Sequence, residues 1–139
     1  MALTCLLDTS VWNRLDRAPA LAAEVTTLLR HGEVGYSDIE RLEVLRSARH
    51  TEHYRRLAAM FAALPKVALT ETALVRAGHV QEQLVERGHH RGVKIPDLLI
   101  AAAAELAGVR VLHYDHDYDL IASITGQDVA WIVEKGSVP

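Results

Sequence analysis

Carboxylates stand at three places in the sequence where an apolar run begins or ends. "CLLDTSVW" ends an apolar run on Asp8, and "KIPDLLIAAAA" sets Asp97 at the head of an apolar stretch. "LHYDHDYDLIA" adds Asp115, Asp117 and Asp119. Converging carboxylates repel one another and take up protons unless a cation joins them. Oxygen ligands without cysteine suit Mg²⁺ or Mn²⁺ better than zinc, so the pattern predicts a metal site that can bind phosphate and activate water.

Each of these acids also has an ordinary structural interpretation when it is taken alone. Asp8 resembles a turn residue or helix cap, and Asp97 resembles a first-turn acid stabilised by the helix dipole. Glu43, in "RLEVLRSAR", is alone better explained as a solvated residue paired with Arg46 or Arg49. Only the set, drawn from four separate segments, makes the metal site the better interpretation.

The elements that must position these acids alternate between short apolar strands and longer helices. The strands expected from apolar patterning are Ala2–Leu7, Glu33–Tyr36, Lys66–Leu69, Val109–Tyr114 and Val129–Val133. Capping, glycine and proline signals predict helices over Pro19–His31, Asp38–Arg49, Thr51–Leu64, Thr70–Arg87, Pro96–Ala107 and Asp117–Ile124. This alternation implies right-handed crossovers, and it predicts an α/β fold: one three-layer α/β/α domain over residues 1–139 with a mainly parallel sheet.

A parallel sheet would bring the acids to one edge. Ligands bind beyond the carboxyl ends of such strands, where the strand order reverses. Asp8 and Asp115 each follow a predicted strand directly, and Glu43 lies within two turns of the start of its helix. Asp97 opens a helix whose small inward residues would let it lie close to the sheet. That inward stripe is predicted to be Ile100, Ala101, Ala104 and Ala107.

Composition bounds the function without deciding it. Half of the 139 residues are hydrophobic and 24% are charged, as in a folded globular protein, and no apolar run approaches the ~20 residues of a membrane helix. The single cysteine, Cys5, cannot form an internal disulfide, which fits the reducing cytoplasm. The net charge is −3. If five of the eighteen acids form one metal site, the rest of the chain has thirteen acids and fifteen Lys and Arg. Those five would be Asp8, Glu43, Asp97, Asp115 and Asp117. A phosphate-rich substrate is therefore neither excluded nor suggested.

Residues around the acids could contact such a substrate. Thr9 and Ser10 follow Asp8 at once and could cap the next helix or hydrogen-bond a carboxylate. Arg46 lies near Glu43, while Arg91 and Lys94 lie in "RGHHRGVK", a Gly- and His-rich stretch predicted to be a mobile loop opening onto the site. For any single basic residue, a solvated surface position is the alternative.

The histidines and the order of the acids also bear on other functions. His89-His90 and His113-x-x-His116 invite a zinc site, but no cysteine partner or recognised ligand spacing supports one. A Mg²⁺-binding receiver-like domain requires adjacent acids after the first strand and a lysine after a later strand, and this sequence has neither. A phosphotransferase with an aspartyl nucleophile would want Asp-x-Asp after the first strand, where position 10 is Ser10.

Four motifs together resemble those of PIN-domain proteins. "LLDTSVW", "RLEVLRSAR", "KIPDLLIAAAA" and "VLHYDHDYD" occur in the order and spacing of that family, and the resemblance is strongest to the VapC-type toxins of bacterial toxin–antitoxin pairs. The resemblance spans Leu3 to Trp131. A lone "DTS" would carry little weight, whereas the ordered set of four is specific.

The resemblance implies a Mg²⁺-dependent endoribonuclease, with Mn²⁺ as a possible substitute. Its catalytic acids would be Asp8, Glu43, Asp97 and Asp115, and its metal ligands would be Asp8, Asp97, Asp115 and Asp117. The resemblance also implies that a metal-activated water attacks the RNA phosphodiester, leaving a 5′-phosphate and a 3′-hydroxyl. The family usually has Thr or Ser two positions before its fourth acid, where this chain has His113.

The resemblance further implies protein partners. Family members are typically homodimers, and a small VapB-like antitoxin inhibits them by placing its C-terminal segment in the crevice. An antitoxin arginine often fills the acidic site, as bidentate pairing with carboxylates favours. The remaining alternative is a PIN domain that has lost catalysis and acts only as an interaction module.

Overall fold

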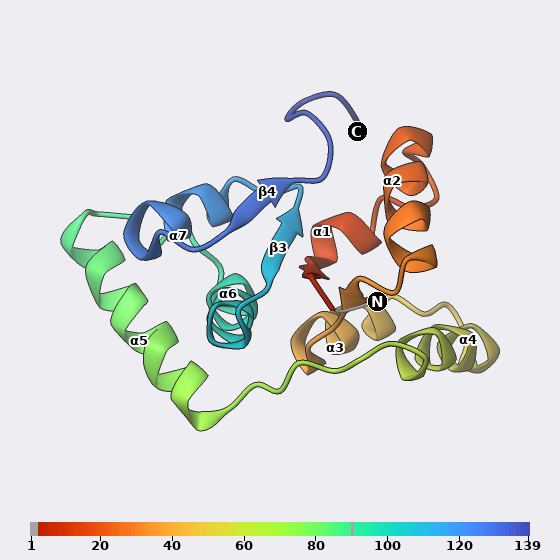
Figure 1. The fold of residues 1–139 in the computed structure, drawn as a ribbon, viewed down its shortest axis with the longest axis horizontal. Helices are drawn as coiled ribbons and strands as arrows, with labels where there is room; N and C mark the ends of the chain where they lie inside the picture. Colours follow the sequence, from red (N-terminus) through yellow and green to blue (C-terminus); the bar gives the residue numbers. More distant parts are fainter. Residues whose placement is uncertain (1–2, 90) are drawn as a thin grey trace.

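Four short parallel strands form the centre of the molecule (Figure 1). The computed structural model describes residues 3–89 and 91–139. Its strands are β1 (Cys5–Leu7), β2 (Val34–Gly35), β3 (Arg110–His113) and β4 (Val129–Trp131), in the order β2-β1-β3-β4. Every pairing is parallel, with Leu6 opposite Gly35 on one side and Val111 on the other. The prediction of a mainly parallel sheet is confirmed, although the expected start of the first strand at Ala2 lies outside the described residues.

Helices connect these strands. They are α1 (Thr9–Trp12), α2 (Pro19–Arg30), α3 (Asp38–Arg46), α4 (Thr51–Ala62), α5 (Glu71–Glu86), α6 (Ile95–Ala107) and α7 (Asp117–Thr125). Six of them match predicted helices to within a few residues. The short α1 was not predicted as an element, because four residues give no helical periodicity to recognise. No described helix has the length and apolar character that would be needed to cross a membrane.

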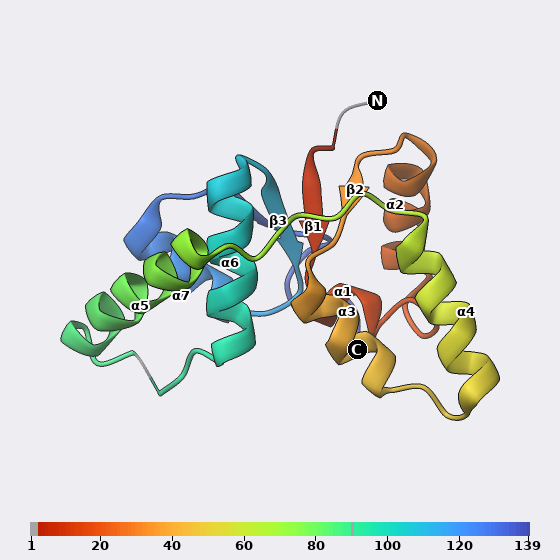
Figure 2. The same cartoon turned by 90° about the horizontal axis from the view of Figure 1, so that it is seen from below.

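Alternation along the strands divides the core into two halves. Leu6 and Val111 pack into a cluster with residues of α5, α6 and α7. Cys5, Leu7 and Leu112 point the other way, into a cluster with residues of α1, α2 and α4. Figure 2 shows the sheet between these two groups of helices. The molecule is therefore the predicted three-layer α/β/α arrangement.

Two details of the predicted fold are wrong. Residues Lys66–Leu69 make only one parallel bridge, between Tyr36 and Lys66, instead of a strand. The segment is short because Thr70 already caps α5 through its hydroxyl, and Pro65 before it has no N–H to give. Ala107 is exposed rather than inward-facing, because it is the last residue of α6 and extends past the sheet.

The strand order reverses at β1, beside the carboxyl end of β3. β1 pairs with β2 on one side and with β3 on the other, so the order in which strands are added to the sheet reverses at β1. Ligands bind at such reversal points in parallel sheets. Asp8 follows β1, and the β3–α7 connection begins at the next strand. The fold therefore brings the carboxylate-bearing segments together as the sequence predicted.

Candidate metal centre

Three aspartates meet at the end of the sheet. Asp97 comes from the first turn of α6, Asp115 from the β3–α7 connection, and Asp117 from the start of α7. One carboxylate oxygen from each lies within 4.8 Å of the others, and in the described part of the chain this is the sole group of three or more possible metal ligands. We call it the three-aspartate cluster. The ammonium of Lys94 lies 2.9 Å from Asp115 Oδ2, 2.9 Å from Asp117 Oδ2 and 3.4 Å from Asp97 Oδ2.

Asp97 is the most unusual acid of the cluster. It is 4% exposed, and its Oδ2 atom is buried without a hydrogen-bond partner. Burial, the neighbouring carboxyl of Asp117 and the charge of Asp8 raise the pKa of Asp97 to about 9, against the opposing charge of Lys94. A buried, unpartnered carboxylate oxygen is costly unless a cation joins it. Asp97 is therefore arranged for a positively charged ligand.

The sequence of α6 explains how Asp97 reaches this position. Pro96 fits the first turn, where a missing N–H costs nothing, and Gly108 ends the helix in the left-handed conformation. Ala101 and Ala104 are almost fully buried, and their small side chains let the helix axis lie close to β3. The head of α6 therefore projects to the carboxyl edge of the sheet.

Local hydrogen bonds fix the other two aspartates. The backbone N–H of Asp117 donates to Oδ1 of Asp115 (2.9 Å), and the backbone N–H of Lys94 donates to Oδ2 of Asp117 (3.1 Å). Burial by itself would raise the pKa of Asp117, but hydrogen bonds from Asp97 and Lys94 outweigh it and lower that pKa. Asp117 is therefore the ionised member of the pair. Asp97 is the member that keeps its proton while no metal ion is bound.

His113 supports the same connection from inside the core. Its ring is fully buried, stacked against Tyr118 at 4.9 Å and edge-on to Trp131 at 5.0 Å. Its Nδ1 accepts a hydrogen bond from the backbone N–H of Asp115 (3.2 Å), and burial lowers its pKa, so the ring is neutral. His113 therefore holds Asp115 where the resembled family usually has Thr or Ser.

The two histidine pairs form no metal-binding group among the described residues. His90 lies outside the described residues. His116 is exposed and contacts Asp119 (3.2 Å). Asp119 is partly exposed, and its carboxylate also accepts the indole N–H of Trp131 (3.2 Å).

Asp8 adjoins the three-aspartate cluster but does not belong to that group of three. It is 2% exposed and caps α1, accepting the backbone N–H of Ser10 at Oδ2 (3.0 Å). Its other oxygen accepts the hydroxyl of Tyr118 (2.6 Å). Its charge contributes to the raised pKa of Asp97. Tyr118 was not singled out from the sequence.

Thr9, Ser10 and Glu43 form the wall beside Asp8. The Thr9 hydroxyl donates to Oε1 of Glu43 (2.7 Å), as one predicted role for Thr9 requires. The Ser10 hydroxyl accepts the backbone N–H of Tyr114 (2.9 Å), which ties α1 to the end of β3. Glu43 itself is partly exposed and is not in the three-aspartate cluster.

Glu40 is a buried acid that sequence reasoning missed. It is fully buried on α3, its carboxylate accepts the backbone N–H of Ser37 (2.9 Å), and the Ser37 hydroxyl also donates to it. Burial raises the pKa of Glu40 to about 8, the Ser37 hydrogen bonds oppose this, and the charge of Asp8 adds to it. The spacing Ser37-x-x-Glu40 is a capping box, a signal that could have identified it.

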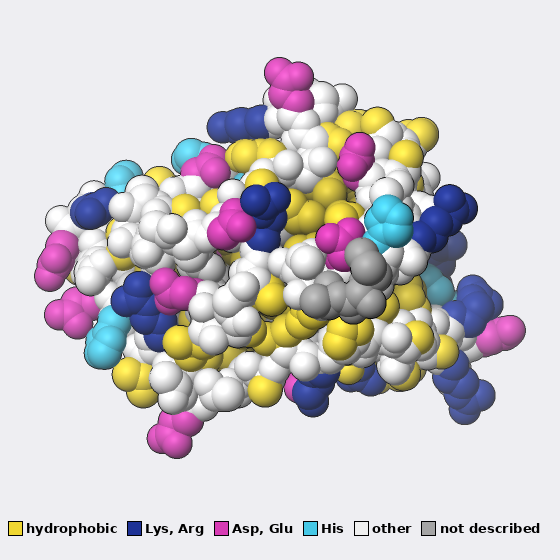
Figure 3. Space-filling view, in the orientation of Figure 1, with side chains coloured by type: hydrophobic (Ala, Val, Ile, Leu, Met, Phe, Trp, Pro, Cys, Tyr) yellow, Lys and Arg dark blue, Asp and Glu magenta, His cyan; other side chains and the backbone are white. Residues whose placement is uncertain are grey.

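The other predicted substrate-binding basic residues lie on the surface. Arg46 and Arg91 are exposed, and no hydrogen bond or ion pair of either is found among the described residues. In the face shown in Figure 3, Lys and Arg side chains gather over α4 at the right-hand edge, where Arg55 and Arg56 are exposed. Of the predicted basic residues, only Lys94 reaches the carboxylates.

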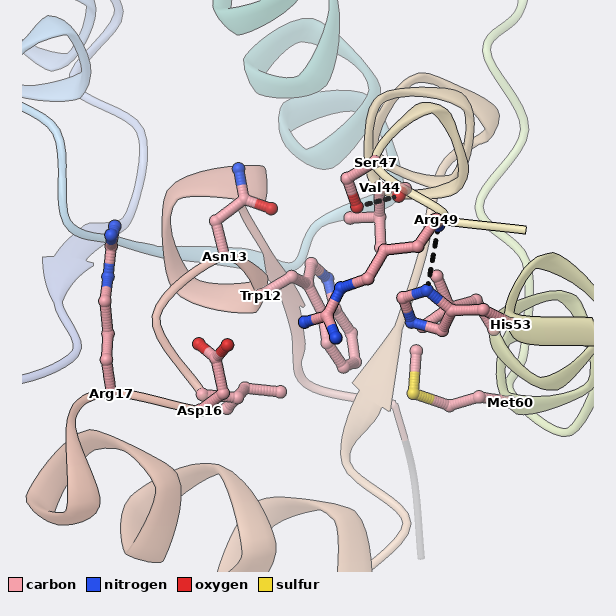
Figure 4. Close-up of a pocket in the computed structure, with 11 residues that line it drawn as sticks. Trp12, Asn13, Asp16, Arg17, Val44, Ser47, Arg49, His53 and Met60 are labelled. Atoms are coloured by element: carbon pink, nitrogen blue, oxygen red, sulfur yellow. Dashed lines mark hydrogen bonds between the residues drawn. The ribbon is translucent and has the colours of Figure 1, made fainter.

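A separate cavity of about 550 Å³ lies between the α1–α2 connection and the α3–α4 pair (Figure 4). Its wall includes Trp12, Leu57 and Met60, together with the charged residues Asp16 and Arg49. The side chain of Arg49 reaches across the cavity towards Trp12. The cavity is amphipathic, and none of the three clustered aspartates lines it.

The whole chain is similar to known proteins. The family model described as PIN domain matches residues 5–124. Ribonuclease VapC51 of Mycobacterium tuberculosis (strain ATCC 25618 / H37Rv) is 47% identical over 138 residues, which cover 99% of each chain. Ribonuclease VapC18 of the same strain is 42% identical over 134 residues, which cover 95% of this chain and 97% of that protein.

Solved structures share the fold at lower sequence identity. The DNA-bound VapBC from Salmonella typhimurium has a TM-score of 0.73 at 20% identity and covers 94% of this chain and 99% of its own. VapBC-5 from Mycobacterium tuberculosis, described as a member of the VapBC family of toxin–antitoxin systems, has a TM-score of 0.62 at 19% identity. This match covers 94% of this chain and 98% of the VapBC-5 chain.

Proposed function

The chain belongs to the PIN-domain family, in its VapC group, and from this membership we propose that it is a Mg²⁺-dependent endoribonuclease. One observation supports the metal in particular: the buried Asp97 Oδ2, unpartnered by any hydrogen bond, at the three-aspartate cluster. A fully oxygen-based ligand set without cysteine suits Mg²⁺ or Mn²⁺. The residues present therefore fit the ion that the family implies.

Asp97, Asp115 and Asp117 would hold the ion, and Asp8 would complete the site from the other side. A bound Mg²⁺ would lower the pKa of a water ligand and neutralise charge on the scissile phosphate. The protein holds these acids in place beforehand: Tyr118 fixes Asp8, and His113 fixes Asp115 through its backbone N–H. Such support of ligands by a second layer of residues commonly changes metal affinity 10- to 100-fold.

RNA is the proposed substrate because the similar proteins are named ribonucleases. The phosphate backbone must approach an acidic centre, so basic residues near it should contribute to binding. Arg46 and Arg91 are exposed and available for that role, which was predicted for them. Cleavage would leave a 5′-phosphate and a 3′-hydroxyl.

We also propose a VapB-like antitoxin as the protein partner, because the solved relatives include toxin–antitoxin complexes. The Lys94 ammonium in the three-aspartate cluster demonstrates that a cationic side chain fits there. An arginine from the C-terminal segment of an antitoxin would form bidentate salt bridges with these carboxylates. Homodimerisation stays a prediction.

The test of the nuclease proposal is cleavage of a labelled total RNA pool by the purified chain without partner. We expect discrete 5′-phosphate fragments with Mg²⁺ or Mn²⁺, and none with a chelator. Asp8→Asn and Asp97→Asn should reduce cleavage to the background of a blank. Equal behaviour of wild type and variants, or metal binding without any cleavage, would favour the alternative of an inert interaction module.

The second acid of the site is tested by a matched pair on α3. Glu40 is buried and bonded to Ser37, whereas Glu43 is partly exposed and paired with Thr9, next to Asp8. We expect Glu43→Gln to lower the cleavage rate by about 10- to 100-fold, as loss of support for the metal site does. Glu40→Gln should lower the cleavage rate less, because the hydrogen bonds of Glu40 stay within its own capping box. The reverse order would identify Glu40 as the acid that the site needs.

A further inference from the structure

Lys94 occupies the place that a metal ion would take. Its ammonium is within hydrogen-bond distance of Asp115 and Asp117, at 2.9 Å each, and 3.4 Å from Asp97. The lysine therefore supplies a positive charge at the three-aspartate cluster.

The cluster has room for one cation. The three carboxylate oxygens lie within 4.8 Å of one another, so an ion that contacts all three would compete with the ammonium for the same oxygens. Two positive charges at that separation would also repel strongly in a partly buried site. The lysine ammonium and a divalent ion are therefore mutually exclusive.

The lysine can leave without disturbing the fold. Its side chain is 61% exposed, so its stem lies along the surface with space to turn outwards. Its backbone is held separately, because Lys94 is the N-cap of α6, its N–H donates to Asp117, and its carbonyl accepts the N–H of Leu98. Only side-chain torsions need to change for the ammonium to swing out.

We propose that Lys94 is a tethered cation that fills the metal site of the free protein and is displaced when a divalent ion binds. The lysine relieves repulsion among the aspartates while no metal is present. The ion must then compete with the ammonium, which lowers its apparent affinity. The released ammonium stays tethered at the head of α6, because Lys94 is the N-cap of that helix. This inference rests on the metal site of the proposed function.

The three lysines of the chain allow a direct test of release. Lys66 pairs with Asp38 (3.0 Å) far from the cluster, and Lys135 lies over the Trp131 ring (5.5 Å). The purified protein is labelled briefly with an amine-acylating reagent, with and without saturating Mn²⁺, and each lysine is quantified by mass spectrometry. We expect Mn²⁺ to increase labelling of Lys94 several-fold, while Lys66 and Lys135 stay unchanged. Unchanged or reduced labelling of Lys94, with Mn²⁺ demonstrably bound, would overturn the proposal.

Calorimetry measures the competition. Lys94→Met keeps the stem but removes the charge, and Lys66→Met is the matched control. We expect Lys94→Met to bind Mn²⁺ about tenfold more tightly, equivalent to about 1.4 kcal/mol, and Lys66→Met to bind like wild type. Equal or weaker binding by Lys94→Met contradicts displacement. Absence of Mn²⁺ binding in all three proteins would instead refute the proposed metal site, and with it this inference.

Discussion

At the scale of single residues, the buried acids of the site differ in how many partners they have. Both oxygens of Asp8 accept hydrogen bonds, whereas the buried Oδ2 of Asp97 accepts none and lies 3.4 Å from the Lys94 ammonium. A buried carboxylate with hydrogen bonds is stable as it stands, whereas a buried carboxylate without them depends on a nearby cation. The difference assigns Asp8 a fixed position and makes Asp97 the acid that most depends on a ligand.

Tyr118 gives the clearest test of that fixed position. Tyr118→Phe removes the hydroxyl that donates to Oδ1 of Asp8 without changing the shape of the ring. We expect the free energy of unfolding to fall by about 1 kcal/mol and the affinity for Mn²⁺ to fall about tenfold or more. Denaturant titration and calorimetry measure the two effects. Tyr114→Phe, which removes a hydroxyl bonded to Val138 instead, should leave Mn²⁺ affinity unchanged.

The raised pKa of Asp97 predicts how pH affects stability and metal binding. Its folded value of about 9 lies above its ordinary value of 3.8, so the unfolded chain ionises first as pH rises. The metal-free protein should therefore lose unfolding free energy as pH increases between these two values, and Asp97→Asn should lose less. Denaturant titrations at several pH values measure this, and stability that rises with pH through Asp97 would contradict it.

Metal binding should follow the opposite trend. A metal ligand must be ionised, so Mn²⁺ binding at neutral pH has to release the proton of Asp97, and affinity should rise with pH. Calorimetry in buffers of different ionisation enthalpy counts the protons released. No release at neutral pH would place the ion away from Asp97.

Which residues form the site was only partly predictable from the sequence. Asp8, Asp97, Asp115 and Asp117 stood out because each is an acid at the edge of an apolar run. Glu40 and Tyr118 did not, because their roles depend on burial that only the packed structure reveals. Lys94 was predicted to contact substrate, and no sequence pattern indicated that its ammonium would enter the cluster.

At the scale of elements, α6 positions the site through the small size of its buried residues. Ala104 is fully buried against the sheet, while Ala107 is exposed at the end of the helix. Ala104→Leu should push α6 outwards and lower the free energy of unfolding by about 1–3 kcal/mol. It should also weaken Mn²⁺ binding, because Asp97 moves with the helix. Ala107→Leu is the control and should change neither quantity.

The elements were predictable where their signals were local. Pro96, Gly108 and the alanine run marked α6 almost to the residue, because each acts on its own turn of the helix. The segment Lys66–Leu69 failed because strand formation depends on a partner, and only Tyr36 bridges to it. The pairing of a short strand such as β2 likewise depends on the strand beside it, which its own sequence does not specify.

At the scale of the whole molecule, the net charge of −3 conceals an uneven arrangement. Three aspartates cluster where the strands end, while basic side chains gather over α4 (Figure 3). The strand order puts Asp8 next to the β3–α7 connection although more than a hundred residues separate them in the chain. The topology, which the alternation of strands and helices predicted, is what turns scattered acids into one site.

The central claim, that the three-aspartate cluster binds a divalent ion in place of Lys94, is tested most directly by a crystal structure grown with Mn²⁺ and measured for its anomalous signal. We predict one strong anomalous peak in contact with the Asp97 carboxylate and with Asp115 or Asp117, and the Lys94 ammonium turned away. A peak elsewhere, or a cluster still filled by Lys94 at saturating Mn²⁺, would contradict the claim.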